Sequence, residues 1–308
     1  MDFRNFWPFP KGGTGIGSET EAEGLDPLEP PRKPRFLVNI VLFLATMATT
    51  ILAGAMLEGV NPLESPGRIL RGIPFSFSLM GILLAHELGH YFMAKRHGLN
   101  VTLPYFIPAP PFIIGTFGAI IKIRSPVRDR RMLLDIGATG PLVGVLFSIP
   151  VLILGLKLSE VKMIQGEGAI HFGSSLLLSL ISWLVVGPLP EGYDIMIHPV
   201  GLAGWFGLLV TSFNLIPIGQ LDGGHVAYAL FGKWQNRLSP FGFFILFGLG
   251  IFAWPGWLVW VLLLVIMGLR HPAPLEEWVT LDRKRRIIGW ITIGIFILTF
   301  VPVPISGF

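Results

Sequence analysis

The chain has 308 residues, of which 52% are hydrophobic and only 14% are charged, and its net charge is +4. Soluble domains carry about 25% charged residues, so this composition excludes an ordinary soluble protein and indicates an integral membrane protein. The chain has no cysteine, which excludes disulfides and thiolate metal ligands and leaves histidine and carboxylate to hold any metal. The basic residues cluster beside apolar segments and form no stripe interleaved with aromatics, so we expect a lipid bilayer and no nucleic acid as partner.

Residues 1–35 are polar and rich in proline and glycine, and acidic residues are followed by a basic cluster at 32–35. This pattern predicts a disordered N-terminal tail that ends in a basic anchor, and neither a signal peptide nor a transit peptide. From Phe36 to about Leu57 the chain is continuously apolar and long enough to span a membrane. We therefore expect a membrane-embedded domain over residues 36–303.

A second apolar segment, from about Pro74 to Ala94, contains the motif H-E-x-x-H at residues 86–90. On a helix, positions i and i+4 lie roughly 40° apart around the axis, so His86 and His90 share one face and can grip one zinc ion. Glu87 can reach a water on that metal and act as general base. Each ionisable group inside a bilayer costs about 2.5 kcal/mol or more, so three in five positions indicate a functional metal site.

Residues 98–131 predict a non-helical segment. Proline recurs within 103–112, which excludes a helix there, and 115–126 is rich in β-branched residues. Apolar backbone of this kind is tolerated beside a membrane only where protein or a cavity satisfies its polar groups. We expect a re-entrant β-like loop or hairpin near the metal, with a free edge available to an extended peptide.

The third span runs from Met132 to about Leu156, and the small residues of Gly140-Pro141-Leu142-Val143-Gly144 allow close helix approach. Asp135 lies at its basic end, and we interpret it as a structural partner of Arg131. The apolar stretch at 174–187 is too short to span and is expected at the interface.

A fourth span begins at Val200 and breaks after Pro217, and a carboxylate appears at the break. A site with two histidines needs a third protein ligand, and Asp222 is the best candidate because it is the only acidic residue between Asp194 and Glu276. Asn214 is able to hold a substrate backbone or a developing oxyanion, and the alternative is a helix–helix hydrogen bond.

Two further apolar stretches complete the predicted fold. Residues 241–268 are broken by Trp254-Pro255-Gly256-Trp257 and form either two short helices or one kinked helix, and 287–301 makes the last span. The fold class is thus an α-helical polytopic membrane protein with about six transmembrane helices. The basic clusters lie at the ends of these helices, and we expect all of those ends in the cytoplasm. His225 is either a partner of Asp222 or an interfacial residue.

Two motifs in this order, His86-Glu87-Leu88-Gly89-His90 in a membrane helix and Asn214-Leu215-Ile216-Pro217 followed by Leu221-Asp222-Gly223-Gly224, resemble the site-2 protease family of intramembrane zinc metalloproteases. The resemblance covers roughly residues 36–231, the family's core. The sequence context is similar to the bacterial, archaeal and plastid branch, and the sequence shows neither the PDZ domain nor the CBS domains that some members carry.

This resemblance implies one zinc ion per chain held by His86, His90 and Asp222, with Glu87 as base and Asn214 holding the substrate or oxyanion. It implies cleavage of transmembrane helices of membrane-anchored substrates, in the cell membrane of a prokaryote or in a plastid membrane, at a site nearer the cytoplasmic face. A metal-ion transporter and a non-catalytic metal-binding scaffold are the alternatives. A transporter needs ligands at successive depths and has no use for the glutamate, and a scaffold is expected to have lost a ligand or the glutamate.

Overall fold

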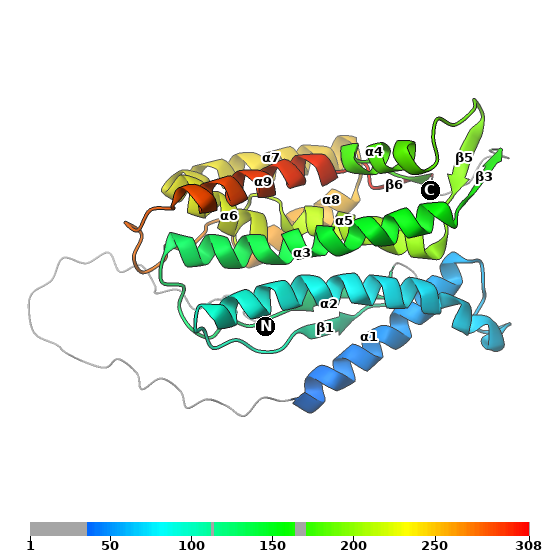
Figure 1. Cartoon of the computed structure of the whole chain (residues 1–308), viewed down its shortest axis with the longest axis horizontal. Coiled ribbons are helices and arrows are strands. Elements are labelled where there is room, and N and C mark those ends of the chain that lie inside the picture. The colour runs from blue at the N-terminus through cyan, green and yellow to red at the C-terminus, as the bar shows by residue number, and fades with distance from the viewer. Residues whose placement is uncertain (1–35, 112–113, 164–170, 308) are drawn as a thin grey trace, which may run out of the picture.

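The computed structural model describes residues 36–111, 114–163 and 171–307, and the tail predicted over 1–35 lies outside them. The described chain is mostly helical (Figure 1). The α-helices, in chain order, are α1 (Phe36–Leu57), α2 (Ile73–Arg96), α3 (Arg130–Lys157), α4 (Leu176–Val185), α5 (Pro199–Asn214), α6 (Asp222–Phe231), α7 (Gln235–Phe252), α8 (Gly256–Met267) and α9 (Arg283–Thr299). Short 3₁₀ turns, η2 (Pro66–Gly72) and η3 (Gly232–Trp234), precede α2 and α7.

Within the described part of the chain, three helical segments are long and apolar enough to cross a membrane: α1, η2 together with α2, and α3. They coincide with the first three spans expected from the sequence. The remaining apolar helices are shorter or less apolar, so the expected total of about six spans goes beyond what helix length supports. The molecule is an integral membrane protein.

Helix α3 lies at the centre of the bundle and packs against α2, α5 and α6 (Figure 1). Small residues make this possible, as the sequence predicts. A Cβ on Gly89 of α2 would lie 3.0 Å from the carbonyl oxygen of Thr139 in α3, and one on Gly204 of α5 would lie 2.7 Å from the backbone nitrogen of Leu152. Close backbone approach without bulky side chains is typical of helix packing in membranes.

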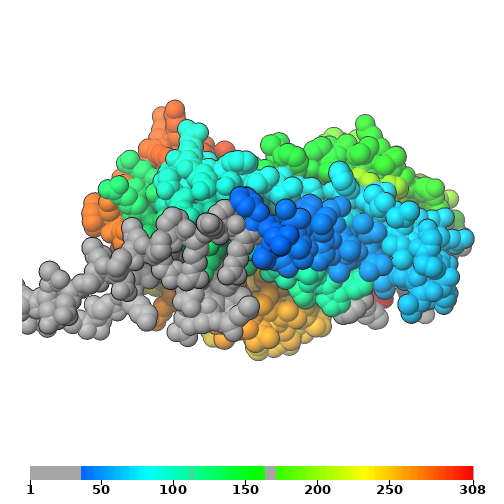
Figure 2. Space-filling model, turned by 90° about the horizontal axis from the view of Figure 1, so that it is seen from below, coloured from blue at the N-terminus to red at the C-terminus, as the bar shows by residue number. Residues whose placement is uncertain are grey.

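Helix α1 crosses the outside of the bundle, and Figure 2 shows it at the surface on the face seen from below. Its apolar side chains are largely exposed, Leu37 by 74% and Leu44 by 58%, which suits a helix that faces lipid. Its inner face holds the segment that follows α2. Asn39 Nδ2 donates to the carbonyl oxygens of Leu103 and Pro104, and Thr49 Oγ1 donates to that of Gly115 at 2.6 Å.

The segment between α2 and α3 forms the antiparallel pair β1 (Tyr105–Pro108) and β2 (Thr116–Ile120). Tyr105 pairs with Ile120, and the register shifts between Phe106 and Pro108. β1 lies along α1, and β2 contacts α2, the helix that carries the histidine motif. The predicted hairpin is therefore present as paired strands. Two further short pairs join β3 (Glu160–Met163) to β5 (Tyr193–Met196) and β4 (His171–Phe172) to β6 (Ile305–Ser306).

Residues 241–268 belong to two helices, α7 and α8, that turn back on one another. The break at 253–255 is the one that the Trp-Pro-Gly-Trp sequence predicts, because proline and glycine end helices. Trp257 is fully buried after the turn, and its indole N–H donates to the carbonyl oxygen of Pro302 at 2.7 Å. The two-helix alternative is thus correct.

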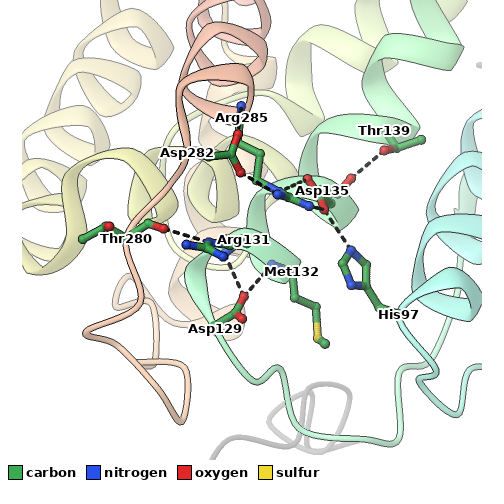
Figure 3. A network of polar contacts seen from close by, with 9 residues as sticks. All are labelled: His97, Asp129, Arg131, Met132, Asp135, Thr139, Thr280, Asp282 and Arg285. Carbon is green, nitrogen blue, oxygen red and sulfur yellow. Dashed lines mark hydrogen bonds and ion pairs between the residues drawn. The ribbon is translucent and has the colours of Figure 1, made fainter.

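A polar network joins the ends of α2, α3 and α9 (Figure 3). Asp135 of α3 accepts hydrogen bonds from Nε and Nη2 of Arg285 at 2.9 and 2.7 Å, and its Oδ2 lies 2.9 Å from Nε2 of His97. The pairing predicted between Asp135 and Arg131 is therefore wrong. Arg131 instead donates from Nε to the carbonyl oxygen of Thr280. The i, i+4 spacing would allow the predicted pair, but both carboxylate oxygens of Asp135 accept from Arg285 of another helix.

The guanidinium of Arg285 also donates to Asp282, the residue that caps the N-terminus of α9. These hydrogen bonds lower the pKa of Asp282 to about 2. The capping carboxylate is therefore ionised at any physiological pH, which favours the helix start.

Candidate metal centre

His86 and His90 project from one face of α2, as the i, i+4 spacing requires. Both residues are buried, with 3% and 6% of their surface exposed, and their Nε2 atoms lie 3.2 Å apart. Two imidazoles held so close in an apolar helix, with ring nitrogens facing each other, can both bind one metal ion.

Asp222 completes this set from the other end of the sequence. The chain leaves α5 at Asn214, turns through a proline and Gly219, which has a positive φ of 56°, and starts α6 at Asp222. Asp222 Oδ2 lies 3.3 Å from Nε2 of His86 and 3.2 Å from Nε2 of His90. Among the residues that the structure describes, these three are the group of histidine and acidic side chains whose ligand atoms all lie within 4.8 Å of one another.

The donor set fits zinc. Ligands at about 2.0–2.1 Å from a tetrahedral zinc ion are about 3.3 Å from each other, which is the spacing of the three donor atoms here. Nitrogen and carboxylate donors, three in number, match the catalytic type of zinc site, in which a fourth position stays open for water or substrate. His90 Nδ1 lies 2.8 Å from the carbonyl oxygen of Ile136, to which it donates, so that Nε2 carries the free lone pair.

Helix α3 provides the room for both imidazoles. A Cβ on Gly140 would overlap Nε2 and Cδ2 of His90, and a Cβ on Gly144 would lie 2.8 Å from Nδ1 of His86. The two glycines are four residues apart on α3, just as the two histidines are on α2. The sequence predicts only a helix-packing role for these glycines and not their contact with the two imidazoles. The matching four-residue spacings are the signal that points to it.

Two more of the predicted site residues lie beside this cluster. Glu87 is 7% exposed and follows His86 on α2, and its carboxylate makes no hydrogen bond or ion pair within the described part of the chain. Asn214 is the last residue of α5, and its Nδ2 lies 3.4 Å from Nε2 of His86. The structure thus brings all five predicted site residues to one place, with a carboxylate and an amide beside the three donors.

Within the described residues, the other histidines contribute no donor atom to this cluster. His97 joins the network at Asp135, and Nδ1 of His198 accepts the backbone N–H of Val200 at the start of α5. His225 Nδ1 lies 2.6 Å from Nε2 of His271, a residue of the loop before α9 for which no sequence pattern indicates a role. His225 is buried, with 3% of its surface exposed.

Comparison with known proteins identifies the family. The model of Peptidase family M50 matches residues 74–249, which include both motifs. The chain belongs to Peptidase family M50. This confirms the resemblance to site-2 proteases drawn from the motifs at residues 86–90 and 214–224.

Relatives from plastids support the resemblance to the bacterial, archaeal and plastid branch of the family, which the sequence context suggested. The chain is 30% identical over 323 residues to the probable zinc metalloprotease EGY1, chloroplastic, of Arabidopsis thaliana, which covers 96% of this chain and 58% of the relative. It is 33% identical to the rice (Oryza sativa subsp. japonica) protein of the same name, over 75% of this chain and 40% of the relative. The probable zinc metalloprotease EGY2, chloroplastic, of Arabidopsis thaliana is 33% identical over 76% of this chain and 42% of its own length. The chain therefore spans about half the length of these relatives.

Proposed function

We propose that this chain is an intramembrane zinc metalloprotease that hydrolyses peptide bonds in or near transmembrane helices of membrane-anchored proteins. The observation that carries this proposal is the cluster of His86, His90 and Asp222. The two histidines and Glu87 are buried on a helix apolar enough to cross a membrane, and Asp222 joins them from the start of α6. The names of the plastid relatives, probable zinc metalloproteases, support both the metal and the reaction. A metal-ion transporter gains no support, because the three donors converge on one point. A non-catalytic metal-binding scaffold gains none either, because Glu87 is present.

Each site residue has a distinct task in this mechanism. The imidazoles of His86 and His90 and the carboxylate of Asp222 hold the zinc ion, which supplies Lewis-acid polarisation and acidifies a water when bound. The carboxylate of Glu87, unpaired within the described residues, accepts the proton of the attacking water and later delivers it to the leaving amine. The amide of Asn214, adjacent to His86, donates to the substrate carbonyl as negative charge develops on its oxygen.

The substrate has to present an extended backbone to this site. A transmembrane helix hides its carbonyl groups in internal hydrogen bonds, so the segment to be cut must first unwind. The hairpin of β1 and β2 supports this step. It is a two-stranded sheet, and β2 runs beside α2 with Phe117 68% exposed. An extended segment that pairs with the edge of β2 gains main-chain hydrogen bonds as it loses those of its helix.

The proposal includes a membrane topology. About six helices span the bilayer within a domain over 36–303, with the core at 36–231, and the β1–β2 hairpin re-enters it near the metal. The basic ends of α2, α3 and α9, which the Asp135 network holds together, face the cytoplasm, or the equivalent compartment of a plastid. His90 lies six residues before the end of α2, so the metal is nearer this face.

The test compares purified wild-type protein with the Glu87→Gln variant in detergent. Both proteins are expected to bind about one zinc ion, and only the wild type should cleave a panel of transmembrane-helix substrates. The substitution keeps the size of the side chain and removes the base, so zinc content serves as the control for an intact site. A wild type that holds no zinc when metal is supplied would refute the proposed metal site. Equal cleavage by both proteins would remove Glu87 as the base.

A further inference from the structure

Two adjoining cavities lie beside α6 and α9, which lie close to α7 at the upper left of Figure 1. The first is bounded by α6, α7 and α9, and the second by the start of α3, α6 and α9. The first, of about 240 Å³, is lined almost entirely by apolar side chains, among them Val226, Leu238 and Phe296. The second, of about 290 Å³, lies at the basic end of α9 and is lined by Arg130 and Arg286. Neither is part of the metal centre.

Phe231 and Trp290 line both cavities and mark the boundary between them. Their rings meet edge to face with centroids 5.7 Å apart. Phe231 is 37% exposed and Trp290 is 57% exposed, so this boundary opens to the surface of the protein. Tryptophan is enriched where the hydrocarbon core of a membrane meets the headgroup layer. With Trp290 at that level, the apolar cavity lies on the hydrocarbon side and the cationic cavity lies on the headgroup side.

The cationic cavity has no carboxylate to neutralise it among the described residues. Arg286 is exposed, and its guanidinium makes no hydrogen bond or ion pair in that part of the chain. Arg130 donates from Nε and Nη2 to the carbonyl oxygens of Ala229 and Leu230, the last turn of α6, at 2.9 and 3.0 Å. A guanidinium has five N–H donors, so Arg130 keeps donors for a further acceptor.

Acidic residues of the adjacent loop are paired with other cations. Glu277 lies 3.2 Å from Nζ of Lys233, and Asp282 is paired with Arg285 at 2.6 Å. Two guanidinium groups therefore face one cavity with no carboxylate partner in the described structure. Arginine pairs bind phosphate well, because their planar forks match its oxygens.

We propose that the adjoining cavities bind an anionic phospholipid. Its phosphate lies between Arg130 and Arg286, and one acyl chain lies in the apolar cavity between α6, α7 and α9. A soluble phosphate compound would use only the cationic half, whereas a phospholipid uses both halves and the aromatic boundary. Basic pockets between membrane helices, on the side with excess positive charge, favour such headgroups.

The experiment measures lipid binding to the full-length protein in detergent micelles by native mass spectrometry. The probes are dioleoyl phosphatidylglycerol, which is anionic, and dioleoyl phosphatidylcholine, which has the same chains and no net charge. The wild type should prefer phosphatidylglycerol. Arg286→Gln should weaken phosphatidylglycerol binding about fivefold, since one basic residue near a membrane surface contributes about 1 kcal/mol.

Lys284→Gln is the matched control. It removes the same charge from the same helix turn, but Lys284 does not line the cavity. It should retain the wild-type preference. Equal losses in the Arg286 and Lys284 variants would show general surface attraction and overturn the proposal, as would equal binding of the two lipids by the wild type. The competitor sn-glycerol 3-phosphate should not displace the lipid. Displacement would assign the cationic cavity to soluble phosphates and exclude the acyl-chain half. Equal zinc content in all three proteins checks that each is folded.

Discussion

Replacing Gly140 by alanine tests whether the His90 imidazole can bind the metal only because position 140 of α3 carries no side chain. A Cβ at this position would overlap Nε2 and Cδ2 of His90 and would lie 2.5 Å from its Cε1. Non-bonded carbon atoms settle at about 3.5–4.0 Å, so the ring has to move by about 1 Å. Metal–ligand distances tolerate deviations of only about 0.2 Å, and the displaced ring therefore ceases to be a proper ligand.

The expected loss of zinc affinity is more than about 100-fold, or roughly 2.7 kcal/mol, because changes to residues that merely support a ligand already cost about 10- to 100-fold. Competition with a chelator of known affinity measures it on the purified protein. Gly81→Ala is the control, since Gly81 lies on α2 and a Cβ there meets nothing within 4 Å. If Gly140→Ala binds zinc as tightly as Gly81→Ala and the wild type do, the close contact of α3 with His90 has no bearing on the metal site.

Three further substitutions separate metal binding, substrate binding and fold stability. Asp222→Asn should abolish tight zinc binding, because a neutral amide oxygen replaces the only anionic donor, and retention of stoichiometric zinc in the presence of a chelator would exclude Asp222 as a ligand. Asn214→Ala should keep zinc and lower kcat by about 10²–10³-fold, whereas an unchanged kcat would assign Asn214 to helix packing. Arg285→Met should lower the free energy of unfolding by about 2 kcal/mol, since it leaves Asp135, with 13% of its side chain exposed, without its guanidinium. Arg283→Met, on the same helix end but exposed, is the control in the unfolding assay, and equal stability of the two variants would count against a structural role for the network.

Local patterns predicted most of the long helices. The apolar run from Phe36 to Leu57 is α1, residue for residue, because hydrophobic length and flanking charge decide where such a helix starts and ends. The motif at 86–90 indicated two ligands on one helix face by periodicity alone. Asp222 could be selected because acidic residues are so scarce in this chain that few candidates existed.

Contacts between distant segments could not be predicted in the same way. Asp135 pairs with Arg285, which is 150 residues away, and no local pattern distinguishes that arginine from the closer Arg131. The buried pair of His225 and His271 likewise depends on how the loop before α9 folds back on α6. Such contacts depend on packing, and a single sequence does not reveal packing partners.

Helix α3 joins the polar network to the metal centre through consecutive residues. Asp135 holds His97 and Arg285, and the carbonyl oxygen of the next residue, Ile136, accepts the Nδ1–H of His90. A helical turn moves as a unit, because its backbone hydrogen bonds fix each residue relative to the next. An anchor at Asp135 therefore also fixes the carbonyl group that orients the imidazole.

Through this connection the last helix, α9, also supports the metal centre. α9 begins at Arg283, beyond the residues 74–249 that match the family, and carries none of the predicted site residues. Yet its first turn supplies Arg285, the cation that holds Asp135 in place. Truncation before α9 would leave the carboxylate of Asp135, which is 13% exposed, without its guanidinium. It would also expose the inner faces of α3 and α6 that α9 covers. The metal centre thus depends on a helix outside the matched segment, and loss of α9 should lower zinc affinity although every ligand remains.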